Sequence, residues 1–446
     1  MRTPALPHQA HFLETLGALP VVCNAAEPGL GKTWMALAWL ERQQARRTLW
    51  LTVAAYVGGT VAEVERLSGF KALTDLQGRV RCTRPGSIYV ISYDHVRRHS
   101  AALGRMQDSF DAVVADESEA LKRIQSKRTR AAVRSLDRIP KRTILTGTLV
   151  TQSLFDIWAQ FLFLDGGQTL GRSYIDFRTK YYMARGPFEW VAQPWALERI
   201  KALIAPKTFW CRKEDCLKLP AVQKRHISVP LHSKVRPLYE QLAEDFTVSL
   251  PSGQTIDTTF IVQKLMRMHQ LVSGAFVADD KSIVRMPCTK RDALKVMLEQ
   301  LPGQKVLVWC RFRFEVEDVA RIADNAGYAT YRVAGEDDPT PAVYHFQTTS
   351  KRAVCVLTLT KGARALTLTA ADTSIYYNRD GSVGRRLQSV DRNYRIGSER
   401  HDSIKRYDLF TRGTLEETML LGLGEKLTEA IKARRPQEVR RYLLGK

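Results

Sequence analysis

Short apolar runs recur through the first half of the chain, and each of them ends in polar residues or glycine. Four of these runs predict buried strands, at residues 48–53, 87–92, 112–115 and 143–145. Stretches with helix-like apolar spacing lie between the runs, and strands that alternate with helices are typical of a parallel sheet covered on both faces. Residues 1–220 are therefore predicted to form an α/β lobe.

The same alternation restarts later and predicts a second α/β lobe over residues 290–446. Its strands are expected at residues 306–310, 329–333, 353–357 and 374–377. Residues 221–289 lack this pattern, and the helical stretches Tyr239–Phe246 and Phe260–Leu271 flank Pro251-Ser252-Gly253. The predicted fold class is thus α/β, with two tandem parallel-sheet lobes and a helical insertion or connection between them.

A glycine-rich loop stands near the start of the first lobe. Ala26-Glu27-Pro28-Gly29-Leu30-Gly31-Lys32-Thr33 follows the short apolar run Val21-Val22-Cys23 and opens a helix-like segment. Strand, glycine loop, Lys-Thr and helix together form the context of a phosphate-binding P-loop. Gly29 and Gly31 let backbone N–H groups point at phosphate oxygens. Ala26 replaces the usual first glycine, and a chance glycine-rich turn before a helix is the alternative interpretation.

Four side chains are predicted to act on a bound ATP. Lys32 would reach its β- and γ-phosphates, and the Thr33 hydroxyl would hold Mg²⁺. Asp116 and Glu117 directly follow the apolar run 112–115. At the end of a strand in a P-loop sheet, Asp116 would help to hold Mg²⁺ and Glu117 would act as general base on the attacking water.

Gln9 lies just upstream of the P-loop. Its amide both donates and accepts hydrogen bonds, so it is predicted to recognise the edge of the adenine base. A helix start with Pro7 in its first turn explains the same residues equally well.

Two arginines in the second lobe complete the predicted site. Arg392 and Arg395 are three residues apart, so on a helix they would share one face. Two guanidinium groups there would stabilise the charge of the transferred phosphoryl group as arginine fingers. Gln388 begins the same polar run and is assigned to nucleotide binding. A surface or phosphate-backbone role is the alternative for the arginine pair.

The chain carries a formal charge of +22, with 68 Lys and Arg against 46 Asp and Glu in 446 residues. Such an excess on a folded chain predicts a polyanionic partner, above all nucleic acid, although a solubilising surface charge is the alternative. Six Lys or Arg lie in the tail 432–446, which is predicted to track a phosphate backbone or to form a plain basic helix.

The seven cysteines are odd in number and scattered, which favours reduced and mostly buried thiols. Cys211 and Cys216 lack a matching Cys or His pair at zinc-ligand spacing. No apolar run approaches the roughly 20 residues that span a bilayer, and the N-terminus lacks the apolar core of a signal peptide. A cytoplasmic protein without a membrane partner is expected.

Several of these motifs resemble those of one family. Asp116–Lys122 and Leu145–Thr148 resemble motifs II and III of superfamily 2 helicase-like ATPases, and more narrowly of the Swi/Snf-type DNA translocases. Ala26–Thr33 is similar to their motif I, Gln9 to their adenine-reading glutamine, and Gln388–Gly397 to their motif VI. Further similar segments are Phe155–Phe161, Arg212–Asp215 and Gly413–Glu417.

The chain also departs from the family pattern. Glu119 stands where the family usually has His or Gln, and Leu149 where it has Pro. Ala363 and Ala365 replace expected glycines in motif V, and Thr367 replaces an expected asparagine. Those positions couple hydrolysis to DNA movement in the family, so the departures bear on coupling rather than on ATP cleavage.

The resemblance implies two RecA-like lobes, of which the first binds ATP and Mg²⁺ and the second closes on them. It implies a DNA-dependent ATPase that moves along double-stranded or branched DNA and grips mainly phosphates. Branch migration, fork remodelling and displacement of bound protein are the activities expected of such a motor. We expect a minimal phage or bacterial version that works as a monomer.

Three alternatives remain open at this point. A strand-separating DNA or RNA helicase would share motifs I, II and VI. A non-hydrolysing nucleic-acid-binding protein would explain the altered motifs II and V. The chain could also be the translocase subunit of a larger restriction or recombination complex, because partner surfaces cannot be recognised in one sequence.

Overall fold

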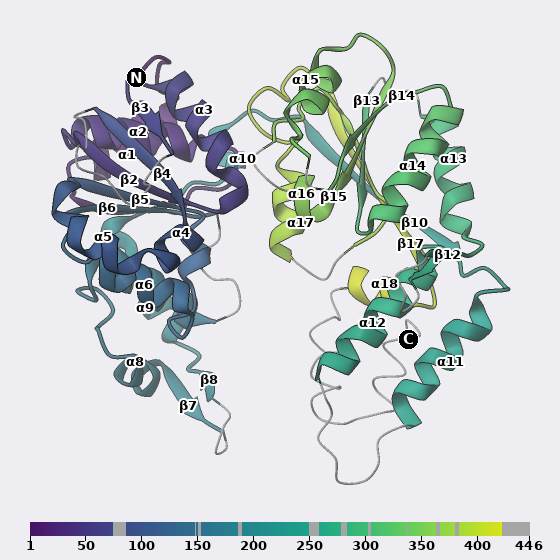
Figure 1. Cartoon of the computed structure of the whole chain (residues 1–446), viewed down its shortest axis with the longest axis horizontal. Helices are drawn as coiled ribbons and strands as arrows, with labels where there is room; N and C mark the ends of the chain where they lie inside the picture. The colour runs from purple at the N-terminus through teal and green to yellow at the C-terminus, as the bar shows by residue number, and fades with distance from the viewer. Residues whose placement is uncertain are drawn as a thin grey trace. The chain divides into compact units, whose positions relative to one another are not determined.

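Each half of the chain builds its own parallel β-sheet. The computed structural model divides into two units, Met1–Lys218 and Leu219–Lys446 (Figure 1). It describes residues 1–74, 86–147, 149, 153–185, 190–248, 258–277, 283–301, 305–335, 337–362, 366–379 and 383–421. Thr148, Pro251-Ser252-Gly253, Ala363, Ala365 and the basic tail 432–446, all singled out above, lie outside these residues. The predicted α/β class with two parallel-sheet lobes is confirmed.

The first unit is organised around a seven-stranded sheet in the order β3-β4-β2-β5-β6-β1-β9, with every neighbouring pair parallel. All four of the strands predicted for this half are present. The strands are β1 (Val21–Asn24), β2 (Arg47–Thr52), β3 (Lys71–Leu73), β4 (Ser87–Ser92), β5 (Ala112–Asp116), β6 (Lys141–Leu145) and β9 (Thr208–Phe209).

Helices cover both faces of this sheet (Figure 1). One face packs against α1 (Pro7–Leu16), α2 (Lys32–Arg42) and α3 (Val57–Leu67). The opposite face packs against α4 (Tyr93–Arg98), α5 (Ser100–Met106), α6 (Lys127–Ser135), α7 (Leu154–Asp165), α8 (Tyr174–Tyr181) and α9 (Ala196–Ile204). Short elements complete the unit: η1 (Ala54–Tyr56), η2 (Gln107–Ser109), η3 (Ser118–Leu121), η4 (Ala205–Lys207), α10 (Lys213–Cys216) and the hairpin β7 (Tyr182–Ala184) and β8 (Trp190–Ala192).

The strands of the first sheet are apolar on both faces because both are covered. On β2, Leu49 and Leu51 point into the core under α4–α9, whereas Trp50 points into the core under α1–α3. Successive side chains of a strand alternate between the two faces, so a strand buried on both sides needs a continuous apolar run. This is why these strands could be predicted from the sequence.

The second unit holds a six-stranded parallel sheet in the order β10-β17-β16-β13-β15-β14. Its strands are β10 (Ala221–Pro230), β13 (Lys305–Cys310), β14 (Ala329–Val333), β15 (Ala353–Thr358), β16 (Thr373–Tyr376) and β17 (Ser403–Arg412). Helices α13 (Thr289–Gln300) and α14 (Arg313–Asn325) pack on one face, and α15 (Thr340–Thr348), α16 (Leu359–Gly362) and α17 (Val383–Val390) on the other.

The predicted helical connection over 221–289 is only partly helical, and here the prediction was wrong. Its first ten residues form β10, which pairs with β17 along its whole length. Because β10 is an edge strand with most of its side chains exposed, polar residues interrupt its pattern. The two predicted helices are present as α11 (Arg236–Val248) and α12 (Thr258–Val272), followed by β11 (Ala275–Val277) and β12 (Ile283–Arg285).

Helices α11 and α12 form a small core of their own with α18 (Leu415–Leu420). Tyr239 lies at its centre, and its hydroxyl accepts a hydrogen bond of 2.8 Å from the backbone N–H of Leu415. Burial raises the pKa of this tyrosine, so it stays protonated.

A buried ion pair joins α13 to α18. The Nζ of Lys290 donates to Oε1 of Glu416 over 2.5 Å and to the carbonyl oxygen of Tyr377 over 3.3 Å. Neither charged side chain reaches solvent. Burial by itself lowers the pKa of Lys290, but the carboxylates of Glu416 and Glu315 outweigh this effect, so the pKa rises and the lysine stays charged.

Within the part of the chain that the structure describes, no helix has the length and apolar character needed to cross a membrane.

Candidate ATP-binding and hydrolysis site

The glycine loop joins β1 to α2 in the predicted strand–loop–helix arrangement. Gly29 and Gly31 have φ angles of +88° and +77°, in the left-handed region that favours glycine. Gly31 is also the N-cap of α2, so its loop leads directly into the positive end of that helix. The Nζ of Lys32 donates to the carbonyl oxygen of Ala26 over 2.9 Å and so lies across the loop. This conformation is one that can cradle phosphate oxygens.

Gln9 lies against the same loop, although it is far from it in sequence. A Cβ atom added to Gly31 would stand 2.5 Å from Nε2 of Gln9, so a larger residue would displace this amide as well as strain the backbone at φ +77°. This Nε2 donates to the carbonyl oxygen of Leu30 over 3.3 Å, and Oε1 accepts from the N–H of Leu6 over 3.0 Å. Nε2 of Gln9 has a second N–H to donate, and Oε1 can accept a second hydrogen bond. The adenine-reading role stays a prediction.

Asp116 and Glu117 stand at the end of β5, in the middle of the first sheet. Asp116 accepts hydrogen bonds from Thr52 Oγ1 over 3.4 Å and from the N–H of Glu117 over 3.0 Å. Glu117 has φ +50° and ψ +53°. Among the described residues, Gln44 is the only other non-glycine residue with a positive φ. A left-handed backbone costs such a residue about 1–2 kcal/mol and is found most often at functional sites.

The electrostatics of this strand end involve one more carboxylate. The pKa of Asp116 is raised to about 7, mainly by burial and next by the charge of Glu117, while Lys32 opposes the shift. Glu63 on α3 also raises this pKa, and its Oε2 accepts from Thr33 Oγ1 over 3.3 Å. The structure thus groups Lys32, Thr33, Glu63 and Asp116. Glu63 belongs to no motif, so the sequence offered no signal for it.

The donor set of Thr33 and Asp116 fits Mg²⁺. This ion is usually held by one or two protein oxygens, with waters and substrate phosphates completing its coordination. Among the described residues there is no group of three or more His, Cys, Asp and Glu side chains that could hold a metal ion by themselves. A site with few protein ligands matches an ion that arrives with ATP.

The P-loop, the Asp-Glu pair and the segment after β6 are linked by direct contacts. A Cβ atom on Gly147 would lie 2.6 Å from Cγ of Pro28, so the loop after β6 packs closely on the P-loop. Ser118 Oγ donates to Gln160 Oε1 over 2.7 Å, and Gln160 Nε2 donates to the carbonyl oxygen of Leu149 over 3.2 Å. Buried Gln160 on α7 therefore connects two of the predicted motifs, a role that its sequence context did not reveal.

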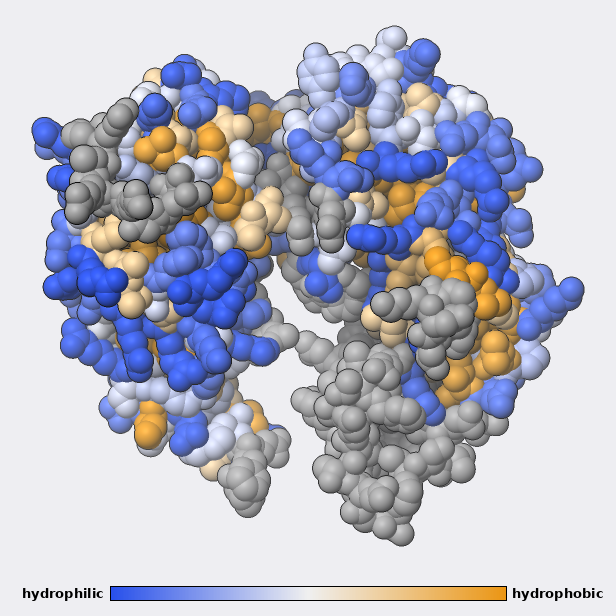
Figure 2. Space-filling view, viewed as in Figure 1, coloured by the Kyte–Doolittle hydropathy of each residue, from blue (hydrophilic) through white to orange (hydrophobic). Residues whose placement is uncertain are grey.

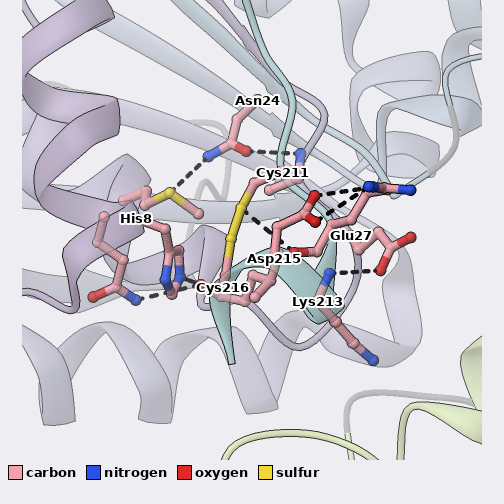
Figure 3. The surroundings of a disulfide bond; sticks show 12 residues. His8, Asn24, Glu27, Cys211, Lys213, Asp215 and Cys216 are labelled. Atoms are coloured by element: carbon pink, nitrogen blue, oxygen red, sulfur yellow. Dashed lines mark hydrogen bonds and ion pairs between the residues drawn. A yellow bond between two sulfur atoms is a disulfide. The ribbon is translucent and has the colours of Figure 1, made fainter. Parts of the chain in front are cut away.

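A disulfide between Cys211 and Cys216 lies beside the P-loop, so the prediction of reduced thiols was wrong for this pair. The single turn of α10 returns the chain from Cys211 to Cys216. Figure 3 shows His8, Asn24 and Glu27 around this disulfide. The N–H of Glu27 donates to the carbonyl oxygen of Cys211 over 3.0 Å, and its carboxylate accepts from the N–H of Lys213 over 2.9 Å. The disulfide-closed turn is thereby tied to the P-loop.

Four other cysteines are buried free thiols, as predicted: Cys23, Cys288, Cys310 and Cys355. Burial raises the pKa of Cys23, Cys310 and Cys355, so these thiols stay protonated. Cys82 lies outside the described residues.

The remaining predicted residues, Gln388, Arg392 and Arg395, belong to the second unit. The expectation that the two arginines share a helix face was wrong, because α17 ends at Val390 and residues 391–397 form turns. Arg392 is buried. Its Nε donates to the carbonyl oxygen of Gln388 over 2.9 Å, and its NH1 group to that of Leu366 over 3.2 Å. Gln388 and Arg395 are half-buried.

Three features define the class of helicase-like ATP hydrolases. They are a P-loop after β1, an Asp-Glu pair at the end of β5 in the same sheet, and a second parallel-sheet unit with an arginine-rich turn. The chain belongs to the SNF2-related family. The SNF2-related domain matches residues 51–274, half of the chain, and the helicase conserved C-terminal domain matches residues 289–397. The resemblance to Swi/Snf-type ATPases and the predicted enzyme class are confirmed.

Individual relatives are distant. Protein p41 of Acyrthosiphon pisum secondary endosymbiont phage 1 is 24% identical over 52% of this chain and 52% of its own length. The SWI/SNF-related matrix-associated actin-dependent regulator of chromatin subfamily A-like protein 1 of Drosophila melanogaster is 24% identical over 84% of this chain and 49% of its own length. The chain thus spans about half the length of these relatives.

Among solved structures, the Sulfolobus solfataricus SWI2/SNF2 ATPase core in complex with dsDNA is similar. It is 20% identical, with a TM-score of 0.47 over 100% of this chain and 97% of that chain.

Proposed function

We propose that this protein hydrolyses ATP to move along double-stranded or branched DNA. The observation that carries the proposal is the grouping of Lys32, Thr33 and Asp116 beside a Glu117 held in a strained backbone conformation. Strained backbone conformations cluster at functional sites, where they fix the direction of a side chain, and this supports Glu117 as the general base. The family, whose members include helicases and translocases, supports the same conclusion.

In this mechanism the first unit binds the nucleotide. The backbone N–H groups around Gly29 and Gly31 hold phosphate oxygens, and Lys32 exchanges its bond to Ala26 for one to the β- and γ-phosphates. Thr33 and Asp116 would hold the Mg²⁺, which would neutralise phosphate charge there. Glu117 accepts the proton of the attacking water.

The second unit supplies charge to the transferred phosphoryl group. Arg395 acts as the arginine finger, with Gln388 and Arg392 in the same turn. Since Arg392 already donates to two carbonyl oxygens, it contributes by holding the turn as well as by its charge. Hydrolysis would thus require the second unit to close on the first. Repeated closing and opening would move the DNA-binding surface of one unit stepwise relative to that of the other.

The DNA contacts are proposed to be mainly to phosphates, because the chain carries an excess of 22 positive charges. Binding should then be insensitive to sequence and should weaken steeply with salt. A monomer that acts in branch migration, fork remodelling or removal of bound protein fits this description. A phage protein among the relatives supports a setting in phage or bacterial DNA processing.

The test is the rate of ATP turnover with no nucleic acid, single-stranded DNA, blunt duplex, four-way junction and duplex RNA, each at two salt concentrations. We expect duplex or junction DNA to raise turnover at least about tenfold, and a Glu117→Gln variant to lose about 10²-fold or more of it while still binding ATP. Stimulation by single strands or RNA alone would instead identify a strand-separating helicase. Absence of turnover with every nucleic acid would contradict the proposal.

The two arginines are expected to behave differently when replaced. Arg395→Ala should lower kcat about 10²-fold and leave ATP affinity nearly unchanged, because one transition-state donor is lost. Arg392→Ala should also destabilise the second unit, since the carbonyl oxygens of Gln388 and Leu366 lose their buried donor. Steady-state kinetics and hydrogen exchange of residues 366–379 measure the two effects, with Arg332→Ala on exposed β14 as control. Equal loss of stability in both variants would refute the division of roles.

A further inference from the structure

The end of the first unit that carries α8 and the β7–β8 hairpin has an unusual surface. We define the hairpin surface by Ile175, Arg178 and Trp190, and the exposed fractions of its apolar members are 63% for Ile175 and 36% for Trp190. Figure 2 shows apolar patches among hydrophilic colours at this end of the unit. Exposed apolar side chains beside a cation on a projecting element are typical of a contact site.

Trp190 is held in a defined orientation. It pairs with Ala184 across the hairpin, and the guanidinium of Arg178 from α8 lies 4.3 Å from the centre of its ring. This cation–π contact fixes the ring and places a positive charge next to it. An aromatic ring beside a cation is the arrangement that stacks on a nucleic-acid base while neutralising its phosphate.

The hairpin is rigidly attached to the ATPase core. Tyr182, at its first position, is buried and stacks on Phe155 with ring centres 4.5 Å apart and planes 10° apart. Its hydroxyl also lies 2.6 Å from Ser153 Oγ. Phe155 belongs to α7, the helix whose Gln160 is hydrogen-bonded to Ser118 next to Glu117. One helix therefore supports both the hairpin and the strand end of the candidate site.

Charge decides which partner this surface fits. Residues 172–192 contain four Arg or Lys and two Asp or Glu, in a chain with a net charge of +22. A purely apolar patch would suit another protein, whereas an aromatic ring beside a cation suits a polyanion with exposed aromatic bases. In fully paired DNA the base faces are covered by stacking, so only an unpaired segment offers them.

We infer that the hairpin surface binds the unpaired strand at a DNA fork or junction, with a base stacked against Trp190 and the adjacent phosphate at Arg178. This inference rests on the proposed function on DNA and specifies its substrate: the motor distinguishes a branch point from plain duplex through this hairpin. Sequence preference is weak, because every base has a stacking face.

The experiment compares a forked DNA that has two unpaired dT arms with a blunt duplex of the same length, by fluorescence anisotropy at moderate salt. Wild-type protein should bind the fork about tenfold more tightly than the duplex. Trp190→Ala should reduce this preference to less than about twofold and leave duplex affinity nearly unchanged, and Trp190→Phe should retain most of it. Tyr344→Ala, which removes an exposed aromatic ring from α15, is the matched control.

Three outcomes would overturn the inference. They are a wild-type protein without fork preference, a preference that survives in Trp190→Ala, and a wild-type dimer that Trp190→Ala converts to monomers in light scattering. The last result would identify the hairpin surface as a contact between copies of the chain. Duplex-stimulated ATP turnover is measured on the same samples. Its absence in wild type would refute the proposed function separately, since fork binding is measured without ATP.

Discussion

Replacing Lys32 by alanine should reduce DNA-stimulated ATP turnover by about 10³-fold, to the background of the preparation. In the structure its Nζ spans the P-loop to the carbonyl oxygen of Ala26, and its charge opposes the raised pKa of Asp116. The variant therefore loses the cation at the β- and γ-phosphates and also leaves the carboxylates of Asp116, Glu117 and Glu63 less compensated. Both effects act on nucleotide binding as well as on catalysis.

The measurement is steady-state turnover with saturating duplex DNA, together with ATP affinity from equilibrium titration. Lys71→Ala, which removes an exposed lysine from β3 of the same unit, should leave both quantities within about twofold of wild type. We also expect the Lys32→Ala protein to keep its unfolding transition, because the lysine side chain is only half-buried and its Nζ bonds to the carbonyl oxygen of Ala26 within the same loop. Turnover above a tenth of the wild-type value would rule out the P-loop as the site of hydrolysis.

Replacing Lys290 by methionine should destabilise the second unit by about 3–5 kcal/mol, because it leaves the carboxylate of Glu416 buried without its cation. Glu416 also accepts a hydrogen bond of 2.9 Å from the N–H of Thr411 at the end of β17. The damage should therefore reach the sheet and not only α13 and α18. Hydrogen exchange of the β13 amides reports the free energy of unfolding of this unit separately from the first.

Two comparisons make this prediction specific. Lys295→Met, on the exposed side of the same helix, should change stability by less than about 0.5 kcal/mol. The double variant Lys290→Met, Glu416→Leu should recover much of the loss, because an apolar pair of similar size carries no buried charge. If Lys290→Met matched Lys295→Met in its exchange rates, the ion pair would not hold the unit together.

Much of the fold could be predicted because its central strands are buried on both faces. Such strands need continuous apolar runs, as β2 and β13 show, and those runs are visible in a single sequence. The edge strand β10 was missed for the opposite reason. Few side chains of β10 are buried, so backbone hydrogen bonds to β17 hold the strand in place. Backbone pairing does not require particular residue types, so the sequence showed no pattern for this strand.

The sequence by itself determined where the residues proposed for phosphate chemistry are concentrated: the P-loop with Lys32 and Thr33, and the pair Asp116 and Glu117. These groups are local, since a loop conformation or a strand end positions each of them, and their residue types follow from the chemistry. Only the tertiary structure decided that Glu63 joins them, that Gln9 packs against Gly31 and that Arg392 is buried in its own unit. Those contacts join residues far apart in the chain or depend on packing, so no short stretch of sequence encodes them.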